Sequence, residues 1–529
     1  MLLAGVLAAS DAQASPPASS VPTPASGTGL DPVPASLAAP IPSQSPTFTG
    51  SGSATTPSIV LSPSVTPVPL PAPTFPAVPP PPPAGPLQAN PGPITTTPTV
   101  TIPPFGSSAQ TQAVPAIGYV NQFTVNNVNG YGTPPDNPIA TNGVYDVAMY
   151  NDSNFHVTMN IMSTSGAFQG AFTMCDLEGF TSCGDPQIVY DRASQRWIYT
   201  FFAFGCSTCG GVVGIGVSDN SNPLSGSAIW ALGKVTTGSY DAPRLGISSD
   251  KVIITVDRTG CTSCSSVDIW VLNKSQLYSM NGFNFDTFSG SGTNWDPVNY
   301  TSNEATTLFE APDSNTGNSG AMETYYVTGP QGGTETWIAQ RWYIANDPNI
   351  AMYAVQPGTA DTLDADSNEF DSAAYSGGVL WVTGNDQCSN GQLCPVFIVF
   401  DISSNNQPTQ VASDFEIQMS DGSDLFYPAL ETTVTRQAVL GVVDYTCASC
   451  PHYGSSGTFQ LTPSGGYQGG AYEDGNSTIA PPSGQTSARW GDFNSCSYVP
   501  NTNPAQATCI GEYAFDGVPQ QEVYTVSYS

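Results

Sequence analysis

Short apolar runs separated by polar turns recur along most of the chain after residue 115. The clearest case is Gly184–Phe204, in which the apolar run Ile188–Tyr190 is followed by the polar segment Asp191–Arg196 and by the aromatic run Trp197–Phe204. Two β-prone runs joined by a short polar segment are typical of a β-hairpin. This stretch therefore predicts a pair of antiparallel strands.

The same pattern returns as an Asp or Pro, an apolar strand, a polar turn and a second strand. It recurs at Asp241–Val256, at Phe370–Val382, at Asp424–Val443, and at Arg489–Phe493 continued by Cys509–Phe515. The anchoring residues are 56, 130, 53 and 68 residues apart, and they are Asp185, Asp241, Asp371, Asp424 and Asp492. The long gap has room for a degenerate copy around Tyr325 and Trp337–Ile344. A repeat of about 50 to 70 all-β residues predicts the blades of a β-propeller with elaborated loops.

Both ends of this region fit the same architecture. Gly143–Tyr150 and Phe155–Met162 predict the hairpin of a first blade. The last β-prone run, Glu522–Tyr528, is expected to pair with a strand near Tyr119, which would close the ring and remove an exposed sheet edge. We therefore predict an all-β protein with a six- or seven-bladed β-propeller over residues 116–529.

The first 115 residues have a different composition. Met1–Ser10 is a short apolar run followed by Ala12-Gln-Ala14, which predicts a signal peptide over residues 1–14. Residues 15–115 are dominated by Pro, Ser, Thr, Ala and Val. Proline fixes φ and lacks an N–H donor, so this tract predicts an extended polyproline II or disordered stalk. A plain flexible linker and an O-glycosylated stalk both fit its composition.

The charge balance limits the partners. The chain has 10 Lys plus Arg against 41 Asp plus Glu, a net charge of −31, and its first basic residue is Arg192. Nucleic acids and anionic membranes need a basic surface, so neither is expected as a partner. After the N-terminus no apolar run approaches the ~18 residues of a membrane span, so membrane insertion is not expected. Such acidity suits a secreted, extracellular protein and can attract Ca²⁺.

The twelve cysteines occur as six near-neighbour pairs. These are Cys175 with Cys183, Cys206 with Cys209, Cys261 with Cys264, Cys388 with Cys394, Cys447 with Cys450, and Cys496 with Cys509. Zinc binding would need two Cys-x-x-Cys pairs to converge, or additional histidines, and the chain has only His156 and His452. Thioredoxin-like redox chemistry would need a βαβ context. We therefore predict six disulfides that each close one loop, in an oxidising compartment.

Two resemblances add to these patterns. The Ser-Pro, Thr-Pro, Ala-Pro and Val-Pro dipeptides of the tract resemble the glycomodules of plant and green-algal hydroxyproline-rich glycoproteins. This resemblance implies hydroxylated prolines that carry sugar, and the candidates are Pro63, Pro67, Pro69, Pro71 and Pro73.

The second resemblance rests on an ordered series of motifs. The series is Pro134-Pro-Asp136, Gly184–Arg192 with Arg196-Trp197, Gly216–Gly226, Ala242–Ile247, and Arg489–Phe493 with Glu512-Tyr513. It resembles a group of secreted bacterial and algal β-propellers of the sialidase-like superfamily. The resemblance implies the propeller fold and no known reaction.

Three kinds of candidate site remain. Sialidase-type catalysis would need an arginine cluster, but the repeated Ser-x-Asp-x-Gly-x-Thr-Trp boxes are missing, and Arg192 and Arg196 are expected to pair with acids such as Asp185 and Asp191. Asp364, Asp366 and Asn368 place oxygen ligands at alternate positions and are candidate Ca²⁺ ligands, although the glycine of a Ca²⁺ hand is absent. N-glycosylation is permitted at four sequons, Asn151, Asn273, Asn299 and Asn476.

These observations predict an extracellular structural glycoprotein without enzymatic activity. A propeller head on a glycosylated, proline-rich stalk would assemble with copies of itself into a surface coat, wall or filament. Two alternatives stay open: a secreted carbohydrate-binding module or adhesin, and a sialidase-like glycoside hydrolase. No cofactor other than the candidate Ca²⁺ is expected, and the expected partners are copies of the chain, joined head to tail, and extracellular glycans.

Overall fold

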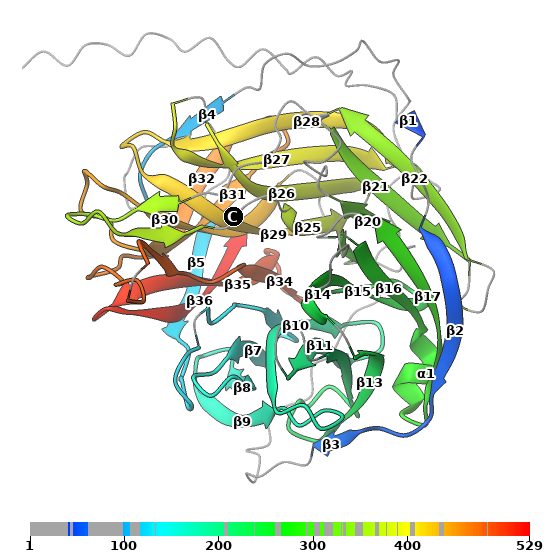
Figure 1. Ribbon diagram of the computed structural model, residues 1–529. Coiled ribbons are helices and arrows are strands. Elements are labelled where there is room, and N and C mark those ends of the chain that lie inside the picture. Colours follow the sequence, from blue (N-terminus) through cyan, green and yellow to red (C-terminus); the bar gives the residue numbers. More distant parts are fainter. Residues whose placement is uncertain are drawn as a thin grey trace, which may run out of the picture. The chain divides into compact units, whose positions relative to one another are not determined.

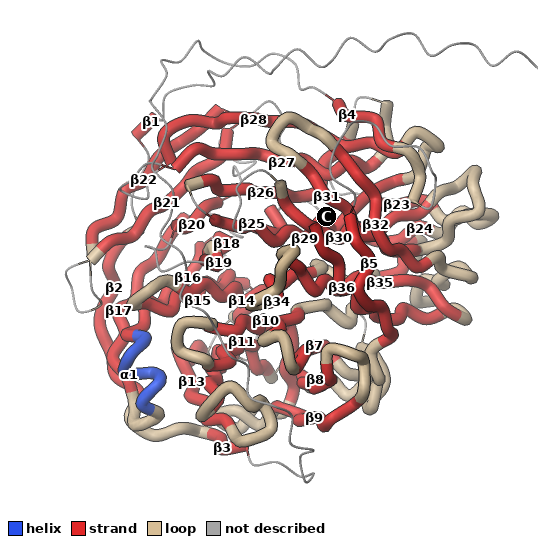
Figure 2. Tube along the Cα trace, turned by 180° about the vertical axis from the view of Figure 1, so that it is seen from behind, coloured by secondary structure: helices blue, strands red, loops and turns tan. Residues whose placement is uncertain are grey.

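The computed structural model describes the chain in segments. These are residues 41–42, 46–61, 99–105, 117–132, 134–205, 210–236, 238–259, 266–291, 295–300, 307–310, 321–329, 331, 335–343, 353–365, 370–376, 378–388, 390–402, 408–432, 438–483 and 485–528. Within these ranges, seven sheets of four or more strands follow one another around a common centre, and each contains four consecutive antiparallel strands (Figures 1 and 2). The predicted all-β propeller is confirmed, and it has seven blades.

Each blade begins with its innermost strand and continues outward. Blade 1 is β6 (Ile139–Thr141), β7 (Tyr145–Asn151), β8 (Val157–Ser163) and β9 (Phe168–Met174). Blade 2 is β10 (Ser182–Asp191), β11 (Arg196–Phe204), β12 (Gly211–Ser218) and β13 (Ser227–Val235). Blade 3 is β14 (Ser239–Ile247), β15 (Lys251–Thr259), β16 (Ser266–Asn273) and β17 (Phe283–Ser291), with α1 (Lys274–Ser279) between its last two strands. Blade 4 is β18 (Trp295–Pro297), β20 (Thr307–Glu310), β21 (Ala321–Thr328) and β22 (Thr336–Tyr343).

The remaining blades complete the ring. Blade 5 is β25 (Phe370–Ser376), β26 (Val379–Gln387), β27 (Leu393–Ile402) and β28 (Pro408–Met419), with β19 (Asn299–Tyr300) parallel to β25. Blade 6 is β29 (Asp424–Thr432), β30 (Val439–Thr446), β31 (Ser455–Leu461) and β32 (Tyr467–Glu473). Blade 7 is β34 (Ser495–Val499), β35 (Gln506–Phe515), β36 (Val518–Tyr528) and β5 (Ile117–Thr124). A small sheet of β23 (Tyr353–Val355), β24 (Thr362–Asp364) and β33 (Ser487–Arg489) lies outside the blades.

Blade 7 joins the two ends of the propeller. β36 pairs antiparallel with β5, with Val526 opposite Tyr119 and Glu522 opposite Thr124. The inner strand β34 of this blade contacts β6 of blade 1. This confirms the predicted ring closure, in which the first strand of the propeller region covers the edge that the last strand would otherwise expose.

The continuously apolar run of β11 has a direct structural reason. Trp197, Tyr199 and Phe201 pack with side chains of blade 1 such as Met149. The alternate residue Ile198 packs with side chains of blade 3 such as Val252. Because both faces of the strand are covered by neighbouring blades, both sets of side chains are apolar. The predicted hairpin is thus a central element of the packing between blades 1, 2 and 3.

Short pieces of the proline-rich tract also form strands. They are β1 (Ile41–Pro42) on β22, β2 (Thr47–Ala54) on β17, β3 (Ile59–Leu61) on β13, and β4 (Thr99–Ile102) parallel to β28. Figure 1 shows β1, β2 and β3 on the outer rim of blades 4, 3 and 2. These strands lie along the edge strands of blades 2, 3, 4 and 5 of their own chain. The boundary at residue 115 stays a prediction, and Pro63, Pro67, Pro69, Pro71 and Pro73 lie outside the described residues.

Four of the six predicted disulfides are confirmed. Cys175–Cys183, Cys388–Cys394, Cys447–Cys450 and Cys496–Cys509 each link near neighbours in the sequence. In the part of the chain that the structure describes, no cysteine is free.

The other two predicted disulfides lie outside the residues that the structure describes. One would join Cys206 to Cys209, and the other would join Cys261 to Cys264. Cys206 and Cys209 lie in the gap between β11 and β12, and Cys261 and Cys264 lie in the gap between β15 and β16, outside the described residues. The prediction of six disulfides is therefore confirmed for four pairs only, and the pairing of Cys209 and of Cys264 stays a prediction.

Candidate functional site

Aspartates from four consecutive blades meet at the centre of the propeller. Asp492 lies shortly before the inner strand of blade 7, and Asp136 lies shortly before the inner strand of blade 1. Asp185 lies on β10 and Asp241 lies on β14. The elements β34, β10 and β14 lie side by side at the middle of the ring in Figure 1. Asp136 is fully buried, Asp185 and Asp492 are half-buried, and Asp241 is exposed to solvent. The cluster therefore extends from the interior to a solvent-accessible surface.

Hydrogen bonds link these four acids from blade to blade. The Asp492 N–H points at Oδ1 of Asp136 at 3.5 Å, and Asn151 Nδ2 donates to Oδ2 of Asp136 at 2.7 Å. The Asp185 N–H donates to Oδ1 of Asn151 at 3.1 Å, and the Ala242 N–H donates to Oδ2 of Asp185 at 3.1 Å. Each blade thus fixes the acid of its neighbour, so the carboxyl groups are held in place before any ligand arrives.

The backbone of the inner strands turns these acids toward the centre. Asp136, Asp185 and Ala242 have φ angles of 53°, 47° and 45°, in the left-handed region. In β10 and β14 this residue directly precedes a proline, and the strand pairing shifts register at the same point. A β-bulge of this kind re-aims side chains and is favoured next to functional sites. Tyr427, with a φ of 51° before Pro428, repeats the arrangement in blade 6.

The carboxyl group of Asp241 holds its proton near neutral pH. The surrounding protein desolvates it, and the neighbouring Asp185 adds a negative charge and a hydrogen bond, so that its pKa rises to about 7. Asp257 contributes further repulsion. Burial, together with the charges of Asp492 and Asp185, also raises the pKa of Asp136 well above its usual range. The charge of Asp185 and its hydrogen bond to Asp241 thus both disfavour ionisation of the Asp241 carboxyl group.

Asp492 has the opposite environment. Arg489 Nη2 donates to both carboxylate oxygens of Asp492, at 2.5 and 2.6 Å. Such a charge-assisted pair favours the ionised carboxylate. The centre thus combines a protonated carboxyl group at Asp241 with a carboxylate at Asp492, an arrangement in which two acids can take different roles.

A buried arginine lies beside this cluster. Arg244 follows Asp241 on β14, and its guanidinium lies over the ring of Phe493 at 5.6 Å. Phe493 is the residue after Asp492, so this contact brings the segments of Asp241 and Asp492 together across the centre of the ring. Arg244 also favours the ionised form of Asp296, although burial raises the pKa of Asp296 to about 7. A cation at this position can attract electron-rich or anionic groups of a ligand.

The predicted candidate residues are distributed differently from these acids. Asp364 lies on β24, where its Oδ2 is 3.9 Å from Arg489 Nη1, while Asp366 and Asn368 lie outside the described residues. The proposed Ca²⁺ site therefore stays a prediction. Arg192 lies over the ring of Tyr498 at 4.7 Å, and Arg196 donates to the Ser218 carbonyl at 3.0 Å. Asp191 pairs with Lys274 of blade 3 at 2.8 Å, and its charge also acts on the guanidinium of Arg192. The expected pairing of Arg192 and Arg196 with acids such as Asp185 stays a prediction.

The four sequons also differ in environment, and their glycosylation stays a prediction. Asn151 is part of the central hydrogen-bond chain, and its amide nitrogen donates to Asp136 and to the Pro134 carbonyl. Asn476 is exposed, Asn273 caps α1, and Asn299 lies in β19. Sequence reasoning missed the role of Asn151 and Asp136 in the centre. The available signal was an Asp close before a proline within an apolar run, as in Asp185-Pro186.

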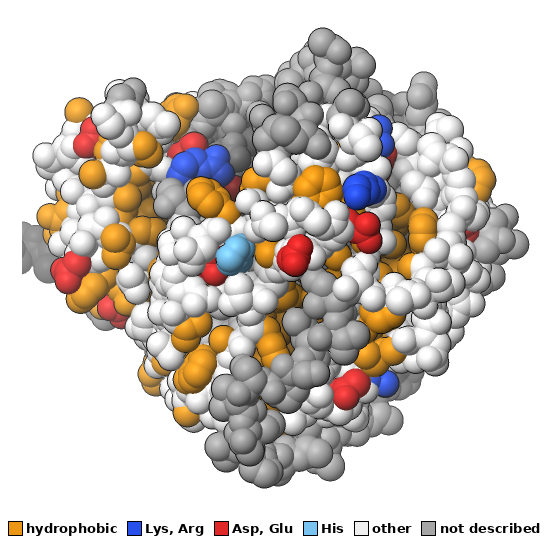
Figure 3. All heavy atoms as spheres, turned by 60° about the horizontal axis from the view of Figure 1, so that its bottom comes forward, with side chains coloured by type: hydrophobic (Ala, Val, Ile, Leu, Met, Phe, Trp, Pro, Cys, Tyr) orange, Lys and Arg blue, Asp and Glu red, His pale blue; other side chains and the backbone are white. Residues whose placement is uncertain are grey.

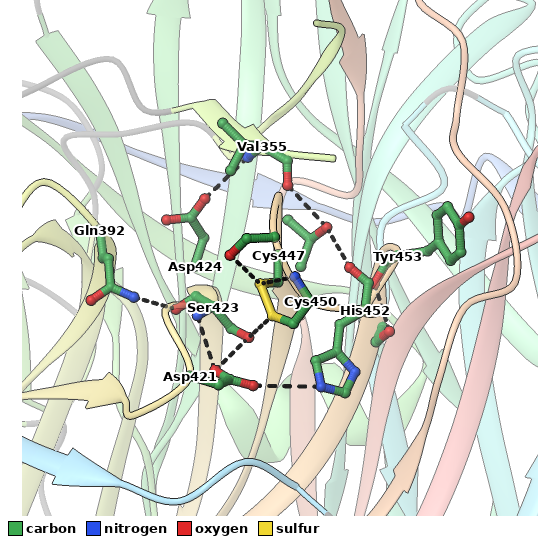
Figure 4. The surroundings of a disulfide bond; sticks show 12 residues. Val355, Gln392, Asp421, Ser423, Asp424, Cys447, Cys450, His452 and Tyr453 are labelled. Atoms are coloured by element: carbon green, nitrogen blue, oxygen red, sulfur yellow. Dashed lines mark hydrogen bonds and ion pairs between the residues drawn. A yellow bond between two sulfur atoms is a disulfide. The ribbon is translucent and has the colours of Figure 1, made fainter. Parts of the chain in front are cut away.

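A second polar cluster surrounds the disulfide Cys447–Cys450 (Figure 4). Asp421, Cys450 and His452 lie close enough together to be compared with a metal site. The sulfur of Cys450 is in a disulfide and is therefore not the thiolate that zinc binds. His452 instead bridges two carboxylates, with its Nε2 3.5 Å from Asp421 and its Nδ1 3.1 Å from Asp474. We interpret the cluster as a charged clamp beside the disulfide.

The His452 clamp predicts a pH-dependent contribution to stability. The hydrogen bond to Asp474 raises the pKa of His452, so the clamp stabilises the fold fully below the unfolded pKa of about 6.5 and loses this effect as pH rises through the folded pKa. His452→Gln should therefore lower the free energy of unfolding at pH 5.5, by about 1 kcal/mol or less because Asp474 is partly exposed. The loss should be smaller at pH 9. Urea unfolding at both pH values checks this, and an equal loss at both would contradict it.

The face of the molecule that Figure 3 draws carries few charged side chains. They are scattered among uncharged polar and apolar ones. Among the described residues, no helix is long and apolar enough to cross a membrane.

Comparisons with known proteins were made for the whole chain. No protein family and no curated protein matches it. Solved structures do match. An α-L-arabinofuranosidase from Fusarium graminearum has 9% identity and a TM-score of 0.38, with 78% of this chain and 98% of that chain covered. An ulvan lyase, which represents a new family of polysaccharide lyase, has 12% identity and a TM-score of 0.36, with 78% and 95% covered. The β-propeller domain of the trilobed protease from Pyrococcus furiosus has 9% identity and a TM-score of 0.34, with 74% and 97% covered.

The prediction of a structural coat glycoprotein without enzymatic activity is corrected by these findings. The solved structures that match include glycosidases and a polysaccharide lyase. The centre of the ring holds Asp241, whose pKa is raised to about 7, and groups with strongly shifted pKa values are concentrated at functional sites. The propeller part of the second resemblance is confirmed.

Proposed function

We propose that the protein is a carbohydrate-processing enzyme that cleaves a glycosidic bond at the centre of the propeller. The observation that carries this proposal is Asp241, a residue that reaches solvent and whose carboxyl group has its pKa raised to about 7 by desolvation and by the neighbouring Asp185. Cleavage of a glycosidic bond needs one carboxylic acid and one carboxylate, and Asp492, held by Arg489, supplies the second. This proposal takes the hydrolase alternative in place of the structural one.

The roles follow from the two protonation states. Asp241 donates its proton to the glycosidic oxygen while the bond from this oxygen to the anomeric carbon breaks. A water molecule adds to the anomeric carbon, and Asp492 accepts the proton that this water loses. Asp185 keeps the proton on Asp241 by repelling the ionised form. Asp136 and Asn151 position these groups without touching the substrate, because Asp136 is fully buried.

The neighbouring residues suit a polar, hydroxyl-rich substrate. Arg244, whose guanidinium lies over the ring of Phe493, supplies a cation near the segments that carry Asp241 and Asp492, where it can bind a carboxylate or an oxygen of the sugar. The Phe493 ring is buried, so it packs against Arg244 and offers no surface on which a sugar ring could stack. We therefore propose an oligosaccharide or polysaccharide as the substrate, bound where Asp241 is exposed to solvent.

The proposal is tested by incubating the full-length protein with a panel of plant, algal and bacterial polysaccharides. New reducing ends, released in proportion to protein concentration, are the expected result. The products are also examined for unsaturated sugars, which a lyase forms and a hydrolase does not. No release from any polysaccharide, under conditions in which the protein is folded, would overturn the proposal.

We further propose that the protein is exported. The four disulfides are typical of an oxidising compartment. In this proposal the tract of residues 15–115 carries sugar on its prolines, as its resemblance to hydroxyproline-rich glycoproteins implies, and the propeller belongs with the sialidase-like superfamily. Association with copies of itself stays a prediction. Intact mass before and after deglycosylation tests the sugar on the tract.

A further inference from the structure

A polar cavity lies at the outer edge of blade 3, away from the central acids. It has a volume of about 580 Å³ and is lined by side chains from three places. The edge strand β2 supplies Ser51 and Ser53, the α1 region and β17 supply Asn273, Gln276 and Asn284, and Gln331 follows β21 of blade 4. Its size is within the ~300–1,000 Å³ that is typical of ligand pockets. The cavity depends on β2, which is a segment of the proline-rich tract.

The wall of this cavity is built around a buried carboxylate. Asp286 is fully buried on β17 and accepts hydrogen bonds from Ser51 and from Gln331 Nε2, the latter at 3.1 Å. Gln276 Oε1 accepts the backbone N–H of Asn284 at 2.7 Å, which fixes the Gln276 side chain against β17. These contacts join β2, β17 and blade 4, so the lining groups are held in place.

The lining chemistry selects the ligand class. Hydroxyl and amide groups both donate and accept hydrogen bonds, as the hydroxyl groups of a sugar do. An apolar ligand would cover these hydroxyl and amide groups without offering them hydrogen-bond partners, which is unfavourable. An anionic ligand would face the carboxylate of Asp286 with no lysine or arginine among the lining residues. We infer that this cavity binds a neutral saccharide.

One lining residue suggests a source for such a sugar. Asn273 is the sequon residue that caps α1, and its Oδ1 accepts hydrogen bonds from the Gln276 N–H at 3.1 Å and from Ser275 Oγ at 2.9 Å. The amide nitrogen, which is the atom that carries an N-linked sugar, therefore points away from the helix. The saccharide can come from a glycan on Asn273 or from a free glycan, and both present the same neutral hydroxyl groups. The inference does not depend on turnover at the centre of the ring.

The test uses the full-length protein secreted by a yeast host. The neutral trisaccharide of N-acetylglucosamine and a trisaccharide of galacturonic acid are titrated into native protein and into the variant Asn273→Gln by calorimetry. Binding of the neutral probe only to Asn273→Gln, with sugar on Asn273 in the native peptide, supports the chain's own glycan as occupant. Binding to both proteins supports a free glycan.

A second variant locates the binding. Asn284→Ala, made in the Asn273→Gln protein, removes one amide from the wall and should weaken the neutral probe about fivefold. The exposed residue Gln387 on blade 5 gives the matched control Gln387→Ala, which should bind as before. Equal affinity in Asn284→Ala, equal affinity for the galacturonic acid probe, or no binding to Asn273→Gln would each overturn the inference. Asp241→Asn should leave this binding unchanged, so a failure here is distinct from a failure of the central site.

Discussion

Replacing Asp241 by Asn should lower kcat for glycan cleavage by about 10²–10⁴-fold, the range expected for loss of a general acid. Asn has nearly the same shape as a protonated Asp but has no acidic proton to give. Asn can keep the hydrogen bonds that Asp241 makes with the Ala242 N–H and with Asp185, and the Ala242 N–H also donates to Asp185, so the site should keep its shape. The KM should therefore change much less than kcat. Steady-state kinetics on the polysaccharide found in the panel measures both.

The control for this variant is Asp176→Asn. Asp176 is exposed in blade 1 and has a φ of 67°, a conformation that Asn also adopts readily. Its replacement should leave kcat unchanged. If Asp241→Asn turned over substrate as fast as this control, Asp241 would not be the acid.

Trp197→Ala should lower the free energy of unfolding by about 3–5 kcal/mol, the range for removing a large aromatic side chain from a core. Trp197 is almost fully buried between blades 1 and 2, and its ring is 4.7 Å from that of Tyr190. Its Nε1 donates to the Ser221 carbonyl at 3.0 Å, so the substitution leaves both a cavity and an acceptor without its donor. Equilibrium urea unfolding measures the loss.

Phe168→Ala provides the comparison for Trp197. Phe168 is an aromatic residue of blade 1 with 42% of its surface exposed, and its loss should change the free energy of unfolding by about 0.5 kcal/mol or less. A loss for Trp197→Ala no larger than this would show that the hairpin is not central to the packing.

The blades could be predicted because their signal is local. An apolar run, a polar turn and a second run at regular spacing define the hairpins of Gly184–Phe204 and Asp424–Val443, and the structure has β10, β11, β29 and β30 there. The pairing of β36 with β5 followed from the need to cover a sheet edge. The strands of the tract could not be foreseen in the same way. β2 and β3 are short segments in a proline-rich context, and the edges of β17 and β13 determine their conformation.

The central site was harder to predict than the fold. The sequence pattern identified Asp185, Asp241 and Asp492 as anchors of a repeat. Their proximity in space, however, depends on β-bulges that contain the left-handed residues Asp185 and Ala242. A proline inside a strand normally argues against a central strand, and here it marks the bulge. In blade 6 the bulge residue is Tyr427 and not the anchor Asp424, so the repeat alone did not show which blades contribute an acid. Proximity between blades is a tertiary property that spacing does not encode.

The most direct measurement of the central claim is the pH dependence of kcat for the native protein and for Asp185→Asn. In the native protein the rate should fall as pH rises through about 7, where Asp241 loses its proton. Because the charge of Asp185 raises the pKa of Asp241, Asp185→Asn should move this fall to lower pH, while the protein stays folded. A shift in that direction supports the conclusion that the charge of Asp185 raises the pKa of Asp241. An alkaline limb at the same pH in both proteins would contradict the account.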